Sequence, residues 1–197
     1  QIIVRDTNTA NGDEGADTLT SIETFHFSDG DIQNSTTKYE EFRVNTNTTN
    51  NQSLSSIIAL TNGGFVVTWS SDQDGSDYNI YAQRYDNNGT AQGNEFRVNS
   101  YTTNSQAASS ITKLTNGDFV VVWQSDGQDG SYNGVYAQRY DANGVTLGNE
   151  FLVNSYTGDS QFEPSITALT DGGFAVAWTS VMRYGIYAQL YDANGMT

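Results

Sequence analysis

The stretch GGFVVTWSS at residues 63–71 decides how the rest of this chain is read. It returns as GDFVVVWQS at 117–125 and as GGFAVAWTS at 172–180. Each copy contains one tryptophan: Trp69, Trp123 and Trp178. They are spaced 54 and 55 residues apart, and the chain has no other tryptophan. A period of this length indicates a repeat array in which every copy is one supersecondary unit.

Each copy contains four segments typical of β-strands. In the first copy they are SIIAL (56–60), FVVTW (65–69), IYAQRYD (80–86) and EFRVN (95–99). FVVTW is almost continuously apolar and β-branched or aromatic, while IYAQRYD alternates between two sets of side chains. No segment has a helical period, so the sequence predicts an all-β fold.

The connections between these segments alternate in length. SIIAL reaches FVVTW through TNGG, and IYAQRYD reaches EFRVN through DNNG, both of which are turn sequences that supply glycine for positive φ. The other two connections, SDQDGSDY and TNTTNNQSL, are longer. In an up-and-down sheet both tight turns then lie at one end and both long loops at the other, where binding residues are expected.

The apolar FVVTW segment predicts a strand that is buried on both faces. Phe65, Val67 and Trp69 are expected to face one neighbouring sheet, with Val66 and Thr68 facing the other. The prediction is a β-propeller-like array of four-stranded antiparallel blades, with about three repeats and incomplete. Three closures remain open: a longer propeller, two or more chains that complete the ring, or an open array.

The domain prediction separates residues 1–40 from a repeat domain at 41–197. The repeats lie near 41–94, 95–149 and 150–197. Residues 1–40 lack the repeat and read as a pair of strands around polar loops.

Two parts of the chain resemble RTX (haemolysin-type calcium-binding) secreted bacterial proteins. GADTLTSIETFHFSDG at 15–30 is similar to a segment that flanks RTX repeats, so residues 1–40 are expected to be an RTX-flank-like strand pair. The array at 41–197 is similar to one found in large RTX-type adhesins. This resemblance implies a secreted or extracellular protein at the bacterial cell surface, associated with calcium.

Composition narrows the class of partner. The chain has 23 acidic and 8 basic residues, a net charge of −15, and no cysteine. Nucleic acid is disfavoured because phosphate binding needs clustered Lys and Arg. No apolar run approaches the ~20 residues that cross a bilayer.

Acidic loops are the candidate calcium sites, because calcium takes six to eight oxygen ligands from such loops. The long loop after FVVTWSS and its second-copy equivalent hold carboxylates, and the third copy has lost them. A degenerate RTX nonapeptide begins at Gly12. The candidate ligands are Asp72, Asp74, Asp77, Asp126, Asp129, Asp13 and Asp17. Solvated acidic loops without a metal are the alternative.

Tyrosines and asparagines in the long loops are candidates for glycan binding, because tyrosine stacks on sugar rings and amides bond hydroxyls. They are Tyr78, Asn79, Tyr101, Tyr132, Asn133 and Tyr156. Ordinary loop chemistry is the alternative. The recurring Gln83, Gln138 and Gln189 are expected to bond backbone of the adjacent blade.

The favoured function is an extracellular, non-enzymatic adhesion module that binds a cell-surface glycan or protein, or its own copies through blade edges. A fragment of a secreted glycan-acting enzyme and a structural self-assembling array are the alternatives. Ser56, Ser110 and Ser165 occupy equivalent inner-strand positions, whereas an enzyme is expected to place unlike charged groups there. No catalytic motif is found.

Overall fold

The structure is a computed structural model that describes residues 24–27, 30–33, 41–75 and 77–197. The chain divides into two compact units, Gln1–Glu41 and Phe42–Thr197. In the first unit β1 (Thr24–Phe27) pairs antiparallel with β2 (Gly30–Gln33). The degenerate nonapeptide, with Asp13 and Asp17, lies outside the described residues.

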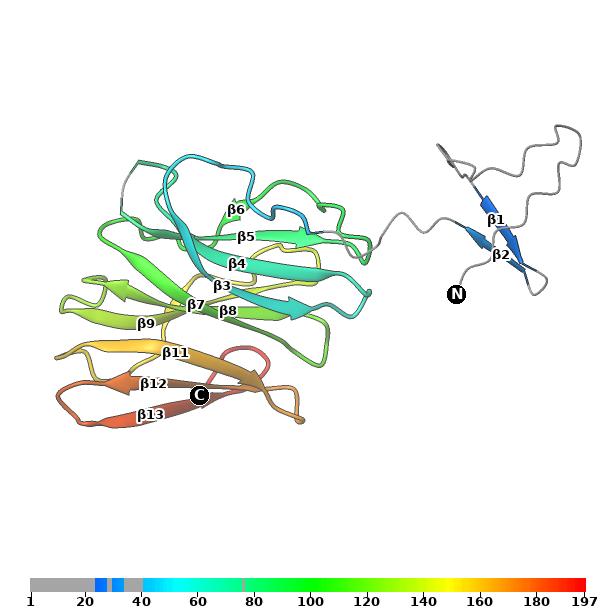
Figure 1. Cartoon of the computed structure of the whole chain (residues 1–197). Coiled ribbons are helices and arrows are strands. Elements are labelled where there is room, and N and C mark those ends of the chain that lie inside the picture. The colour runs from blue at the N-terminus through cyan, green and yellow to red at the C-terminus, as the bar shows by residue number, and fades with distance from the viewer. Residues whose placement is uncertain (1–23, 28–29, 34–40, 76) are drawn as a thin grey trace, which may run out of the picture. The chain divides into compact units, whose positions relative to one another are not determined.

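The second unit contains three antiparallel sheets (Figure 1). They are offset from the predicted repeats, because the segments EFRVN (95–99) and EFLVN (150–154) supply the last strand of the preceding sheet. The first sheet contains β3 (Gln52–Ala59), β4 (Phe65–Ser71), β5 (Asn79–Tyr85) and β6 (Phe96–Arg97). The second contains β7 (Gln106–Lys113), β8 (Phe119–Asp126), β9 (Asn133–Tyr140) and β10 (Phe151–Leu152). The third contains β11 (Gln161–Ala168), β12 (Phe174–Ser180) and β13 (Gly185–Tyr191).

Strand order within each sheet follows the chain, which makes each sheet a meander. The prediction of an all-β array of four-stranded antiparallel blades is confirmed, with three strands in the last blade. The described residues include no helix with the length and hydropathy that crossing a membrane requires.

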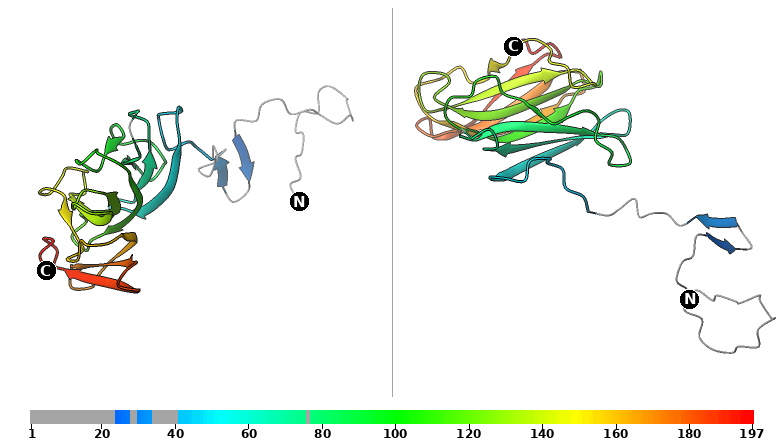
Figure 2. Two further views of the ribbon diagram at one scale, coloured as in Figure 1. Left: turned by 90° about the vertical axis from the view of Figure 1, so that its left-hand side faces the viewer. Right: turned by 90° about the horizontal axis from the view of Figure 1, so that it is seen from above.

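The three sheets lie face to face and fan out, as the left view of Figure 2 shows. The first strands β3, β7 and β11 are neighbours across the sheets, so they form the inner side of the fan. This is the arrangement of propeller blades around an axis.

Two apolar clusters join the sheets. The first combines Val66, Ile80 and Ala82 of the first sheet with residues of the second sheet that include Val121 and Trp123. The second cluster repeats this arrangement between the second and third sheets. Trp123 is fully buried in the junction between the first and second sheets. The predicted division of these strand residues between two neighbouring sheets is confirmed in the second sheet, where Phe119, Val121 and Trp123 face the first sheet and Val120 and Val122 face the third. In the first sheet Val66 faces the second sheet, whereas Val67 and Trp69 pack only on residues of their own sheet and on Val44.

The tight turns after β5, β9 and β13 are held by one aspartate each. Asp86 Oδ1 accepts hydrogen bonds from the backbone N–H of Asn88 (2.8 Å) and Thr90 (2.9 Å). Asp141 and Asp192 make the equivalent pairs of bonds. These bonds lower the pKa of Asp192 from its usual value, because they favour the carboxylate.

The recurring glutamines have a partner that the sequence did not predict. Gln83 Nε2 donates to the carbonyl oxygens of Arg84 (2.9 Å) and Gly93 (3.2 Å), within its own repeat. Gln138 repeats both bonds and Gln189 the first of them. The expectation that they bond the adjacent blade is wrong: the turn that follows each strand returns close enough to take the amide.

Each inner strand has a bulge that moves its start toward the long loops. The register shifts between Ser53 and Ser56 and at the equivalent places in β7 and β11. The bulged residues have left-handed backbone: Leu54 (φ 54°), Ala108 (φ 54°) and Glu163 (φ 53°). Non-glycine residues rarely adopt this conformation, so the strand reading from SIIAL alone placed these strand starts several residues too late.

Candidate functional site

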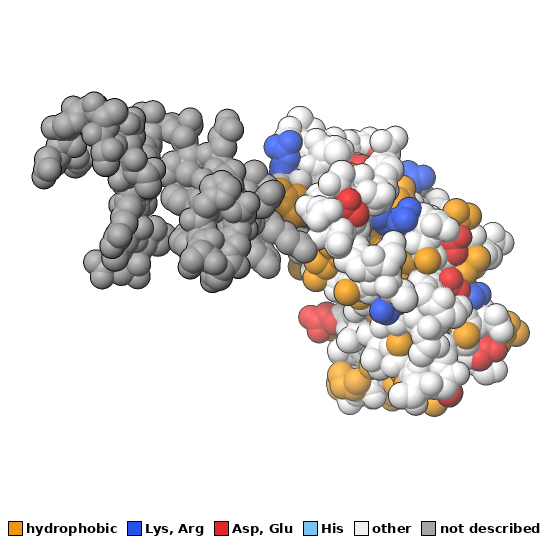
Figure 3. All heavy atoms as spheres, turned by 90° about the vertical axis from the view of Figure 1, so that its right-hand side faces the viewer, with side chains coloured by type: hydrophobic (Ala, Val, Ile, Leu, Met, Phe, Trp, Pro, Cys, Tyr) orange, Lys and Arg blue, Asp and Glu red, His pale blue; other side chains and the backbone are white. Residues whose placement is uncertain are grey.

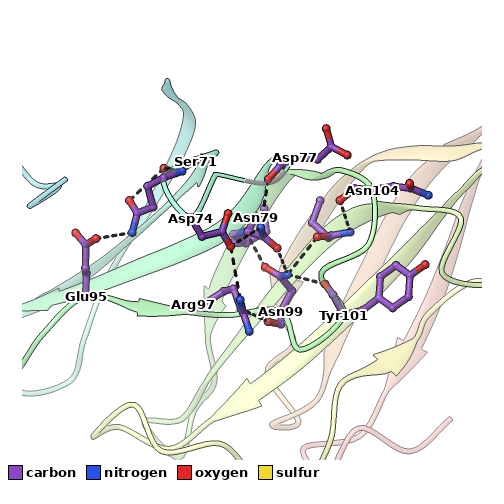
Figure 4. Close-up of polar contacts among 12 residues, drawn as sticks. Ser71, Asp74, Asp77, Asn79, Glu95, Arg97, Asn99, Tyr101 and Asn104 are labelled. Atoms are coloured by element: carbon purple, nitrogen blue, oxygen red, sulfur yellow. Dashed lines mark hydrogen bonds and ion pairs between the residues drawn. The ribbon is translucent and has the colours of Figure 1, made fainter. Parts of the chain in front are cut away.

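The polar and aromatic side chains that could bind a ligand are concentrated at the long-loop end of the sheets. Its elements are the β4–β5, β8–β9 and β12–β13 connections, the loops that lead into β7 and β11, and the starts of the inner strands. Figure 4 shows this end in the first repeat, where an ion pair and a chain of amides hold the loops together.

Asp74 anchors the β4–β5 loop. Its Oδ2 accepts a hydrogen bond from Asn79 Nδ2 (3.0 Å) and lies 3.6 Å from Arg97 NH1, an ion pair that is partly exposed (Figure 4). Asn79 in turn accepts from the buried Asn99 Nδ2 (2.6 Å), and Asn99 Oδ1 accepts from the Ile80 backbone N–H (2.7 Å). The carboxylate therefore holds this loop on β5 and β6.

Glu95 forms a second anchor beside the first. Its Oε1 accepts from Gln73 Nε2 (2.7 Å) and its Oε2 accepts from the Thr46 backbone N–H (2.9 Å). Tyr81 lies close to both carboxylates and is buried. Burial, followed by the charge of Asp74, raises the pKa of Tyr81 above its usual value, so the phenol stays protonated.

The second sheet keeps one anchor and changes the other. Glu150 accepts from Gln128 Nε2 (2.6 Å) and the Ser100 backbone N–H (2.6 Å), as Glu95 does. Asp129 Oδ1 accepts from the Ser131 backbone N–H (3.1 Å). Its buried Oδ2 has no hydrogen-bond partner among the described residues.

Two substitutions between the repeats explain this difference. The strand registers place Gly134 where the first repeat has Asn79, and Leu152 where it has Arg97. Both side chains that serve Asp74 are therefore missing around Asp129. Burial, followed by the charge of Asp129, raises the pKa of Tyr136 to about 12.

The third repeat replaces carboxylates with a cation held between aromatic rings. The guanidinium carbon of Arg183 lies 4.0 Å from the ring centroid of Tyr187 and 5.4 Å from that of Tyr156. The buried Asp159 accepts a hydrogen bond from the Met182 backbone N–H and fixes the short β12–β13 turn. Tyr184, at the tip of this turn, is 92% exposed.

Exposed tyrosines mark this end of the second and third repeats. Tyr132 is 66% exposed in the β8–β9 loop, and Tyr156 is 41% exposed in the loop before β11. With Tyr184 they give three rings on loops of two adjacent repeats. The Arg183 stack orients the ring of Tyr156, so it is presented in a defined direction.

Glu163 is a residue that sequence reasoning missed. It is exposed and lies at the bulge of β11, at the loop end of an inner strand. The equivalent bulge positions hold Leu54 and Ala108, so a carboxylate occurs in one copy only. The serines at the equivalent inner-strand positions 56, 110 and 165 lie after the bulge. They suggested that the inner strands have the same side chains in every copy, because the bulge positions before them were not compared. A comparison of SLSS, AASS and FEPS would have shown the difference.

The other predicted residues have varied surroundings. Asp72 Oδ1 accepts from the Asn51 backbone N–H (2.8 Å), and the Asp77 carbonyl accepts from Asn79 Nδ2 (3.2 Å). Asp126 lies opposite Asn133 in the β8–β9 pairing. The backbone carbonyls of Tyr78 and Tyr101 accept from the Gln106 backbone N–H (2.7 Å) and Asn99 Nδ2 (2.7 Å). Asn79 is fully buried, so it serves the loop network.

No group of three or more His, Asp or Glu side chains arranged to hold a metal occurs in residues 41–75 and 77–197. In both acidic loops a carboxylate oxygen bonds backbone N–H groups. Calcium at these loops stays a prediction that the structure does not test.

No family model and no curated protein matches the sequence. Solved structures match by fold. A Hadza microbial sialidase has a TM-score of 0.53 at 14% identity, covering 74% of this chain and 36% of the sialidase. An endo-arabinase from Bacteroides thetaiotaomicron has a TM-score of 0.51 at 15% identity, and the match covers 77% of this chain and 60% of the arabinase. An α-L-arabinofuranosidase from Lactobacillus brevis has a TM-score of 0.50 at 11% identity, and the match covers 85% of this chain and 59% of the arabinofuranosidase.

These are β-propeller glycoside hydrolases, and this chain spans between 36% and 60% of their length. The expected RTX family is wrong, because no match in sequence supports it and the structural neighbours are of another kind. The expectations of an RTX-type adhesin and of a non-enzymatic module are corrected by the same finding, which agrees better with the alternative of a glycan-acting propeller fragment. The RTX expectation rested on the segment 15–30 and on the pattern of the array at 41–197, and neither likeness is supported by a match in sequence.

Proposed function

We propose that this chain is part of a glycan-acting propeller enzyme, and that its long-loop end binds a carbohydrate chain across the second and third repeats. The observation that carries the proposal is the set of exposed rings at this end: Tyr132, Tyr156 and Tyr184. Tyrosine faces stack on the apolar faces of sugar rings, and nearby polar groups bond the hydroxyls. The fold shared with glycoside hydrolases supports the same class of ligand.

Glu163 is our candidate for one of the two carboxyl groups that hydrolysis of a glycosidic bond employs. It is exposed, it lies on an inner strand, and its backbone N–H donates to Gln124 Oε1 of the second sheet (3.3 Å). This bond joins the bulge to the neighbouring blade and fixes the point from which the carboxylate extends. Because glycans are met outside bacterial cells or at their surface, a secreted location is part of the proposal.

The test measures binding before hydrolysis, because the chain spans only part of the length of its structural neighbours. Sialylated and arabinan oligosaccharides are titrated by calorimetry, and released sugar is then assayed. Tyr156→Ala is expected to weaken binding roughly tenfold, since a lost stacking contact amounts to about 1.4 kcal/mol. Glu163→Gln is expected to keep binding and lose sugar release.

Asp118→Asn is the matched control, because Asp118 lies in a tight turn at the opposite end and bonds only its own turn. It is expected to leave both readouts unchanged. Absence of binding to either class of oligosaccharide would overturn the proposal.

A further inference from the structure

Two sheet faces pack together at each junction inside the three-sheet unit. The outer faces of the first and third sheets are of the same two kinds. Each internal junction places the back of one sheet, such as Val66, Ile80 and Ala82, on the front of the next, such as Val121 and Trp123. The second junction uses the equivalent residues. The third sheet has no sheet behind it among the described residues, and the first has none in front.

The back of the third sheet is apolar and exposed. Ile186 and Leu190 are 73% and 61% exposed, whereas Ile80 and Val135, the equivalents of Ile186, are completely buried. Ala188 is likewise exposed, in contrast to the buried Ala82 and Ala137 of the other sheets. Figure 3 shows hydrophobic side chains gathered at its lower edge, over the third sheet.

The front of the first sheet is apolar as well, with one part left open. Val67 and Trp69 face a groove of about 330 Å³ whose rim includes Leu54 and Val44. Leu54 is 58% exposed. The same part of the second sheet is filled at the internal junction by residues of the first sheet.

The segment 42–45 makes the same contacts with the first sheet that the EFRVN segment of β6 makes with the second sheet and the EFLVN segment of β10 makes with the third. The hydroxyl of Tyr85 donates to the Val44 carbonyl (2.6 Å), as Tyr140 does to Val98 and Tyr191 to Val153. Phe42 lies 5.3 Å from the Tyr85 ring, against 5.6 Å at both internal junctions.

Residues 42–45 lack the strand pairing that β6 and β10 have. β6 pairs with β5, and β10 pairs with β9, but in the described chain residues 42–45 join no strand. At the other end of the unit, β13 has no fourth strand beside it among the described residues. The segment and the edge therefore offer complementary sides of the pairing that β6 makes with β5 and β10 with β9.

We propose that two copies of this chain associate head to tail, with residues 42–45 of each copy completing the third sheet of the other. By the register of the first two sheets, Phe42 lies opposite Ala188 and Arg43 opposite Tyr187. The Val44 N–H donates to the Ile186 carbonyl, and Asn45 Oδ1 accepts from the Ile186 N–H. Val98 and Asn99 bond Ile80 in this way (2.7 Å for each bond).

A second copy fits because it supplies both missing halves at once. Three sheets from each copy make six, which is within the 4–8 blades of known propellers. A contact between unlike faces closes into a ring when its rotation permits. The contact is independent of the proposed glycan activity.

The junction between copies is expected to be weaker than the internal ones. Arg84 NH1 donates to the Asn143 carbonyl and Arg139 NH1 to the Asn194 carbonyl (2.7 Å), which joins each sheet to the turn of the next. Leu190 stands in this position in the third sheet and offers no such bond. Association is therefore expected to depend on protein concentration.

The first test measures mass by sedimentation across a range of concentrations at physiological salt. The expected result is a shift toward twice the 21.5 kDa of the chain as concentration rises. Ile186→Asp is expected to abolish the shift, and Leu190→Arg to move it to lower concentration. Val145→Asp is the control, since Val145 is 59% exposed but lies in a turn of the middle repeat.

The second test checks the register. The chain has no cysteine, so Phe42→Cys with Ala188→Cys introduces the only pair. Residues opposite each other in antiparallel strands have Cα atoms about 4.5–5.5 Å apart, within the range of a disulfide. Oxidation is expected to give covalent dimers, whereas Phe42→Cys with Val145→Cys is not. A monomeric mass at all concentrations, or equal cross-linking of both pairs, would overturn the proposal.

Discussion

The second and third sheets have nearly the same sequence, yet equivalent positions have opposite surroundings. Val135 and Ala137 of β9 are completely buried, whereas Ile186 and Ala188 of β13 are exposed. The strands do not differ in pattern; they differ in whether another sheet lies behind them. The comparison teaches that a repeat of this type encodes both faces of a junction, and that a neighbour decides whether either face contributes to stability.

The largest effect is expected where a junction is fully formed. Trp123→Ala should lower the free energy of unfolding by about 3–5 kcal/mol, because it leaves a cavity in a site with no exposed surface. Urea denaturation followed by circular dichroism measures it. Tyr184→Ala, at a ring that is 92% exposed, is the control and should change stability by less than about 0.5 kcal/mol.

The same substitution at equivalent positions sharpens the comparison. Ile80→Ala should cost about 2–5 kcal/mol, since Ile80 is buried between the first two sheets. Ile186→Ala should cost less than about 0.5 kcal/mol when dilute protein is unfolded, because its side chain is 73% exposed. Similar losses at both sites would show that the third sheet is covered within a single chain.

Alkaline pH should weaken the second repeat through Tyr136. Its pKa is about 12 in the folded chain against about 10 when unfolded, so folding favours the protonated phenol. This contribution, roughly 2 kcal/mol, is fully present below pH 10 and is lost as pH rises toward 12. Denaturation at pH 8 to 11 measures it. In Tyr136→Phe the decline in stability should be shallower; an identical decline would assign it to other groups.

The smallest effect is expected from exchanging the partners of the two acidic loops. Leu152→Arg places a guanidinium beside Asp129 as Arg97 lies beside Asp74, and should raise stability by at most about 1 kcal/mol. Arg97→Leu should lower it by a similar amount. Thermal unfolding at low and high salt checks both, since screening should reduce each change. Salt-independent changes would point to packing by the side-chain stems.

Candidate-site residues were predicted less well than the strands. The sequence directed attention to Asp74 and Asp129 because they are acidic residues in loops. Only the strand pairing shows that Arg97 lies beside Asp74, whereas Leu152 takes the equivalent place near Asp129. Glu95 and Glu150 went unnoticed within EFRVN and EFLVN, although each joins two loops that are distant in the chain. Glu163 was missed because a bulge begins its strand earlier than alternation suggests.

The sequence by itself determined the repeat, the strands and the faces of FVVTW, because apolar spacing and glycine-bearing turns are local properties that recur with the period. It also determined the aspartate turns, whose hydrogen bonds stay within five residues. Only the tertiary structure decided which copies are covered, which carboxylates have partners, and that residues 42–45 lie on the first sheet without a strand to pair with. Those outcomes depend on contacts between residues that are some 20 to 50 positions apart, such as Asp74 with Arg97 and Tyr85 with Val44, and no local pattern encodes them.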